Sequence, residues 1–156
     1  MSVIAQPTVA DAAEVRRLRT LYRLLADLSR AKALEDVYEA ALASLLDATS
    51  ADRAAILLFD DDGVIRFKSS RGISLESQAA VTGHSPWRRG TLDVLPLVVP
   101  DVSRDQSLAA YRRDLEREGI RALVFIPLAL NNGVFGKFML YYAEPHHSAA
   151  DELEIA

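Results

Sequence analysis

The stretch RALVFIPLALNNGVFGKFMLYY, Arg121–Tyr142, decides the fold, because it predicts a β-hairpin. Two apolar runs of strand length flank Asn131-Asn132-Gly133. An Asn-Gly pair adopts the positive φ values that a tight hairpin turn requires. Pro127 lacks an N–H donor for the ladder, so we expect an edge position or a bulge there.

A second hairpin is predicted upstream of this one. Residues 53–59 are almost entirely apolar and end in the turn sequence Asp-Asp-Asp-Gly at 60–63. Residues 64–71 then alternate apolar and charged side chains, which indicates one buried and one wet face. The irregular stretch that begins at Gly72 contains a short strand at 97–99 and a helix at 103–118, with Gly119 as the C-cap.

Helical periodicity is strongest at residues 33–48, whose apolar face should lie on the sheet. An earlier helix begins near Thr8. Its seam follows the heptad spacing of helix pairs, which favours either dimerisation or packing on the domain's own core; the seam residues are Leu18, Leu21, Leu25 and Leu28. Residues 148–151 predict another helix start close to the last residue. We therefore expect an excised piece of a longer protein with a truncated C-terminal helix.

Composition sets the class of protein. The 156 residues are 50% apolar and 26% charged, which is typical of a single globular domain. The absence of cysteine excludes disulfides, thiolate metal sites and thiol nucleophiles. The sequence shows neither a membrane-spanning apolar run nor a signal peptide, so we expect a cytoplasmic protein without a membrane partner. The net charge of −4 argues against nucleic acid as a partner.

The order of these elements resembles a GAF domain, of the kind found in bacterial sensor histidine kinases. The resemblance covers roughly residues 20–156 and is carried by four short motifs: Gly83-His-Ser-Pro-Trp87, Pro100-Asp-Val102, Gly119-Ile-Arg121 and Gly136-Lys-Phe-Met-Leu-Tyr-Tyr142. It implies an α+β sandwich (PAS/GAF-related) with a central antiparallel sheet of five to six strands. The terminal helices would cover one face, and a short helix and loops would cover a ligand pocket on the other.

The resemblance also implies a function. Residues 1–32 would be an N-terminal region with an amphipathic signalling and dimerisation helix, and residues 33–156 a GAF domain with a truncated C-terminal helix. We expect a ligand-sensing input domain of a two-component sensor histidine kinase, working as a homodimer with a downstream kinase or other output domain. The alternatives are a structural dimerisation module without ligand and, less favoured, the input domain of a cyclic-di-nucleotide enzyme or transcriptional regulator.

Several ligands known for GAF domains do not fit this sequence. Cyclic-nucleotide-binding members carry Asn-Lys after the last strand, then a Phe, three residues and Asp-Glu. Asp151-Glu152 match this pattern, but Ala143-Glu144 stand in place of Asn-Lys and His147 in place of the Phe, which disfavours cyclic nucleotides. Covalent bilin attachment needs a cysteine. The ligand is therefore unidentified, and the open choices include non-covalent haem or bilin and other small molecules.

The candidate pocket residues lie in or beside the irregular middle: Arg71, His84, Trp87, Asp101, Ser103, Tyr111, Arg112 and Arg121. His84 and Trp87 suit a planar or anionic ligand, although a Pro-Trp pair in a loop is also a common structural plug. Arginines can hold a carboxylate or phosphate, but Asp101 and Arg121 can equally pair as a structural lock. No motif assembles a nucleophile with a base, and no metal site is expected, since Asp60–Asp62 suits a turn.

Overall fold

The computed structural model describes residues 9–147 and 153. In chain order its elements are α1 (Val9–Leu28), α2 (Leu34–Ala48), β1 (Arg53–Phe59), β2 (Ile65–Arg71), α3 (Leu75–Val81), β3 (Leu97–Val99), η1 (Gln106–Leu108), α4 (Arg112–Arg117), β4 (Ala122–Leu130) and β5 (Gly133–Tyr142). The strands form one antiparallel sheet in the order β2-β1-β5-β4-β3. An α+β sandwich with a five-stranded sheet, as predicted, is confirmed.

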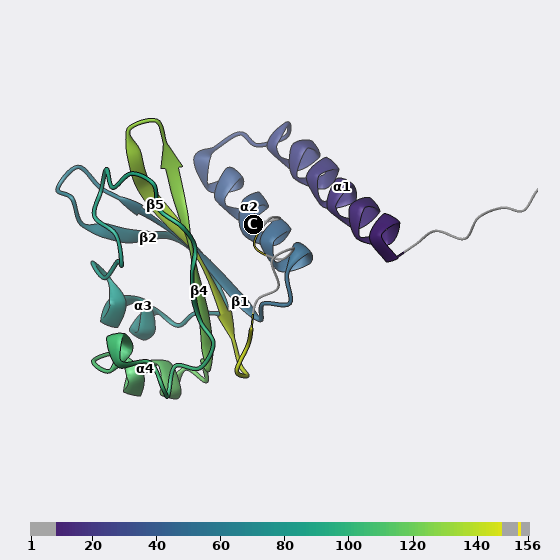
Figure 1. The fold of residues 1–156 in the computed structure, drawn as a ribbon. Coiled ribbons are helices and arrows are strands. Elements are labelled where there is room, and N and C mark those ends of the chain that lie inside the picture. Colours follow the sequence, from purple (N-terminus) through teal and green to yellow (C-terminus); the bar gives the residue numbers. More distant parts are fainter. Residues whose placement is uncertain (1–8, 148–152, 154–156) are drawn as a thin grey trace, which may run out of the picture.

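The sheet separates two apolar layers, with α2 on one face and α3, η1 and α4 on the other (Figure 1). Alternation along the strands produces this division, because successive side chains point to opposite faces. In β4, Ala122 and Val124 pack with α2, while Leu123 and Phe125 face the opposite layer. The α2-side layer also includes Leu153, the one described residue beyond 147.

Both hairpins occur where the sequence predicts them. Gly133 has a φ of +92°, and a Cβ atom at this position would overlap the backbone of Gly90. This turn therefore requires glycine for its backbone conformation and for its close approach to the loop. Pro127 pairs with Lys137 of β5 but lies beyond the segment of β4 that pairs with β3, so β4 is an edge strand at this point, as expected.

The Asp-rich turn between β1 and β2 is neutralised by cations of β2. Asp60 and Asp62 both accept hydrogen bonds from Arg66, at 2.9 and 2.7 Å, and Lys68 donates to Asp60 at 2.5 Å. Hydrogen bonds from Arg66 lower the pKa of Asp62 to about 2. These contacts support the interpretation of 60–63 as a turn.

The prediction of one helix over residues 103–118 is wrong. Instead, the chain forms the short η1 and then α4. Asp101 accepts hydrogen bonds from the backbone N–H and hydroxyl of Ser103, and Asp105 does the same for Ser107. Such local side-chain bonds compete with the helical backbone ladder, which explains the interruption.

Helix α3 was not predicted from the sequence. Ser74 caps its N-terminus, because its hydroxyl accepts from the Ser77 N–H at 3.2 Å. The Glu118 side chain then accepts bonds from the Ser74 N–H, the Ser74 hydroxyl and the Ser77 hydroxyl. A carboxylate from the end of α4, distant in sequence, thus holds a seven-residue helix in place.

Helix α1 packs along α2 and projects away from the sheet (Figure 1). Arg23 on α1 pairs with Asp47 on α2 at 3.3 Å. The predicted seam does not turn toward this contact, since Leu18, Leu21 and Leu25 are 59%, 44% and 66% exposed. Leu28 is half-buried. The predicted C-terminal helix start at 148–151 lies outside the described residues.

Candidate functional site

A cavity of about 40 Å³ lies between the sheet and the layer formed by α3, η1 and α4. Strand side chains form its base and helix and loop side chains cover it. The lining residues are Leu57, Phe67, Val81, His84, Leu108, Tyr111, Leu115, Leu123, Phe125, Lys137, Met139 and Tyr141. A cavity needs about 10–15 Å³ of such volume to hold one water molecule, so this cavity has room for about three water molecules. As it stands, this space is far too small for a tetrapyrrole.

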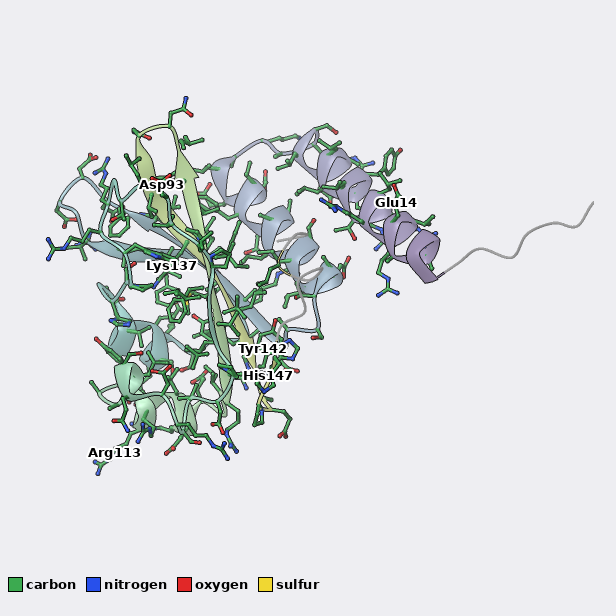
Figure 2. All side chains as sticks on the ribbon, viewed as in Figure 1. Glu14, Asp93, Arg113, Lys137, Tyr142 and His147 are labelled. Atoms are coloured by element: carbon green, nitrogen blue, oxygen red, sulfur yellow. The ribbon has the colours of Figure 1, made fainter. Side chains whose placement is uncertain are left out.

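Lys137 is the exceptional residue of this site. It is 2% exposed and is the one charged residue in the buried core of the described chain. The alternation of β5 directs its side chain to the same face as Met139 and Tyr141, and Figure 2 labels it on the side of the sheet where α3 and α4 lie. Its Nζ donates to the His84 backbone carbonyl at 2.8 Å and lies 5.1 Å from the centre of the Phe125 ring.

Burial changes the proton affinity of the cavity residues. Desolvation lowers the pKa of Lys137 to about 7, because an ammonium group loses its hydration in apolar surroundings. Desolvation also lowers the pKa of His84, and the nearby Lys137 charge lowers it further. Burial raises the pKa of Tyr141, and the Glu118 carboxylate adds to that effect. The cavity therefore disfavours charge on all three groups.

Two of the eight sequence-predicted residues line the cavity, His84 and Tyr111. Their rings are in contact, with centroids 4.4 Å apart and planes tilted by 44°. His84 is positioned by the loop after α3, where its N–H bonds to the Val81 carbonyl at 3.0 Å. Trp87 packs against the same apolar layer without lining the cavity.

The predicted basic residues lie outside the cavity lining. Arg71 donates two hydrogen bonds to Glu39 and so ties β2 to α2 on the opposite face of the sheet. Arg112 donates to the Asp105 carbonyl at 3.1 Å, and its Nε is buried without a hydrogen-bond partner among the described residues. Arg113, its neighbour, projects from α4 into solvent (Figure 2).

Asp101 and Arg121 form the pair that the sequence offered as a structural lock. The Arg121 Nη2 lies 3.8 Å from Asp101 Oδ1. Hydrogen bonds from Ser103 lower the pKa of Asp101, with smaller contributions from the charges of Arg121 and Arg104. Asp101, Ser103 and Arg121 are thus grouped around a turn at the edge of the fold, away from the cavity lining.

Sequence reasoning missed Lys137, although the pattern contained a signal. Residues 134–142 are apolar except for glycine, the two tyrosines and this lysine. With the period of two, Lys137 falls on the same face as Met139 and Tyr141, which any sheet covered on both faces must bury. A charged residue at a buried strand position indicates a candidate functional site.

The described residues offer no group of three metal-ligating side chains, and none of their helices has the length and apolar character to cross a bilayer.

Comparisons with known proteins agree on one family. The GAF domain model matches residues 33–156. A domain of a protein assigned as a two-component sensor histidine kinase, from Sinorhizobium meliloti 1021, is 41% identical, with a TM-score of 0.73 over 80% of this chain and 87% of that one. No curated protein matches the chain.

Two more distant structures share the fold. The GAF domain of a phosphoenolpyruvate-protein phosphotransferase from Coxiella burnetii is 18% identical, with a TM-score of 0.71, covering 90% of this chain and 86% of that one. The phycoerythrobilin-bound GAF domain of a cyanobacterial phytochrome is 19% identical, with a TM-score of 0.66, covering 91% and 89%. With a family model that spans most of the sequence, the chain belongs to the GAF domain family.

Proposed function

We propose that this chain is the ligand-sensing input domain of a signalling protein, a sensor histidine kinase of a two-component system. Membership of the GAF family supports a regulatory role, and the 41% identical domain comes from a protein assigned as a sensor histidine kinase. In this proposal the domain itself performs no catalysis, and a downstream kinase domain in the cytoplasm reads its state.

The observation that carries the proposal is the cavity beneath α3 and α4. Its base is the five-stranded sheet, whereas its cover consists of short helices and loops. Val81 of α3 and His84 of the following loop lie in that cover. A ligand in the cavity contacts both layers, so it can favour one position of the cover over another.

Helix α1 supplies the proposed route of the signal. Its exposed leucines, Leu18, Leu21 and Leu25, follow the spacing of a two-helix seam. Association of two copies along α1 would bury these side chains and make the domain a homodimer. Because α1 packs on α2 and α2 packs on the sheet, a change in the sheet layers can reach the dimer seam.

A thermal-shift screen of a metabolite panel tests ligand sensing. Stabilising compounds should lose their effect in Val81→Phe, which fills the cavity from α3. Leu75→Phe is the matched control, because Leu75 lies on the same helix and is 82% exposed. If no compound stabilises the wild-type protein, or if both variants respond alike, the cavity is not a sensing site and a dimerisation module without ligand becomes the better description.

A further inference from the structure

The buried lysine identifies the chemistry of the cavity's ligand. We propose that the cavity binds a short-chain monocarboxylate, whose carboxylate accepts hydrogen bonds from the Lys137 ammonium group. This inference rests on the ligand-sensing role proposed above and names the class of ligand.

Lys137 is incompletely satisfied by the protein. An ammonium group has three N–H donors, and the described residues supply one acceptor, the His84 carbonyl. The Phe125 ring gives a weaker cation–π contact at 5.1 Å. Since the residue is 2% exposed, bulk water does not solvate the other two donors. A buried charge of this kind is costly unless it is paired.

No acidic side chain lines the cavity in the described structure. The titratable groups that face Lys137 are His84 from the loop after α3, Tyr111 before α4, and Tyr141 on β5. The Glu118 carboxylate acts on the lining through Tyr141, but its oxygens already accept from Ser74 and Ser77. When Lys137 is charged, the described lining therefore supplies no counter-charge, and a bound anion in the cavity would provide one.

The apolar lining of the cavity determines which group can accompany the carboxylate in the ligand. Apart from Lys137, His84 and the two tyrosines, every lining side chain is apolar, including Leu57, Leu123 and Met139. An alkyl group is favoured against such walls, whereas an inorganic oxyanion would bury unpaired oxygens there. Room for about three water molecules limits the ligand to a few non-hydrogen atoms, as in acetate or propionate.

Binding should be linked to protonation. Without a ligand, the pKa of Lys137 is about 7, so a large fraction of the amine is neutral at neutral pH. A carboxylate beside it favours the ammonium form and raises its pKa. The protein should therefore take up a proton when the acid anion binds slightly above neutral pH, and affinity should fall as pH rises.

Isothermal titration calorimetry in chloride-free buffer tests the inference directly. The titrants are sodium acetate, propionate and nitrate, with acetamide as the neutral isostere of acetate. We expect saturable carboxylate binding, proton uptake detected by comparing two buffers of different ionisation enthalpy, and weaker binding of acetamide and nitrate. Lys137→Met should weaken binding roughly 10- to 100-fold. Lys32→Met, which removes an exposed lysine remote from the cavity, should not.

Distinct results would overturn the inference. Equal carboxylate affinity in wild type and Lys137→Met excludes the ammonium as the anion's partner. If that variant fails to fold, binding of acetamide to the wild type as tightly as acetate excludes it instead. Tight nitrate binding without propionate binding would show that the cavity binds an inorganic oxyanion and not a carboxylate. If carboxylates fail but neutral compounds from the metabolite panel bind, the carboxylate inference falls and ligand sensing stands. If neither carboxylates nor neutral compounds bind, the carboxylate inference and the proposed ligand sensing are both wrong.

Discussion

Replacing Lys137 by methionine should make the free domain more stable below neutral pH. The unfolded chain holds the lysine with the ordinary pKa of 10.5, and the folded protein with a pKa of about 7. Between these values the unfolded state binds more protons, so this residue makes the free energy of unfolding rise with pH. Below about pH 7 its destabilising effect is complete, and above about pH 10.5 it has vanished.

The size of the effect follows from the pKa difference. The full interval from 10.5 to about 7 corresponds to at most about 5 kcal/mol. Methionine keeps a similar length without charge, so Lys137→Met should recover part of this at about pH 6, less the lost hydrogen bond to His84, worth about 1 kcal/mol. We expect a net gain of about 2–4 kcal/mol at that pH and little gain near pH 10.

Urea unfolding followed by the fluorescence of Trp87, the single tryptophan, measures this difference at a series of pH values. The difference between the two proteins isolates Lys137 from other titrating groups. Lys32→Met serves as the control and should leave the pH profile unchanged. A Lys137→Met profile parallel to that of the wild type from about pH 6 to 9 would show that Lys137 is not desolvated in the folded protein, which would refute the reasoning.

Three further predictions follow from other contacts. In Lys137→Met the pKa of His84, measured by NMR titration, should rise relative to the wild type yet stay below its ordinary value, because desolvation is the larger cause of its shift; no change would disprove the coupling. Gly133→Ala should lower the free energy of unfolding in urea by about 2–3 kcal/mol, since the added Cβ would overlap Gly90. Gly63→Ala has open space around it and should lower the free energy of unfolding by only about 1–2 kcal/mol. Equal losses in the two variants would contradict the close approach of Gly133 to Gly90. Glu118→Gln should speed amide hydrogen exchange in α3 by weakening the bonds to Ser74 and Ser77, and unchanged exchange there would show that this carboxylate does not anchor the helix.

Strands and their pairing could be predicted from the sequence because local chemistry determines them. The Asn131–Gly133 turn and the apolar runs beside it specify the β4–β5 hairpin without reference to the rest of the chain. The α2 stripe likewise requires an apolar sheet face to cover. The layer of α3, η1 and α4 that covers the cavity could not be predicted in this way, because its structure depends on contacts between residues distant in sequence.

Glu118 illustrates the limit most clearly. It stabilises the start of α3 through Ser74 and Ser77, more than 40 positions earlier in the chain, and no local pattern reveals that partnership. The cavity residues could be predicted from the sequence only in part. His84 and Tyr111 were predicted and line the cavity, whereas the predicted arginines form contacts elsewhere. Lys137 could have been found from its period-two position in β5, but its lack of a carboxylate partner required the fold.

The most direct test of ligand sensing uses a probe that the cavity already contains. The chain has two methionines, Met1 and Met139, and Met139 lines the cavity. NMR of protein labelled with ¹³C at the methionine methyl groups therefore gives one resonance from inside the site. Saturating propionate, or a compound identified in the metabolite screen, should shift the Met139 signal in the wild type and in Leu75→Phe, but not in Val81→Phe. A ligand that stabilises the protein while the Met139 signal stays fixed would contradict the assignment of this cavity as the sensing site.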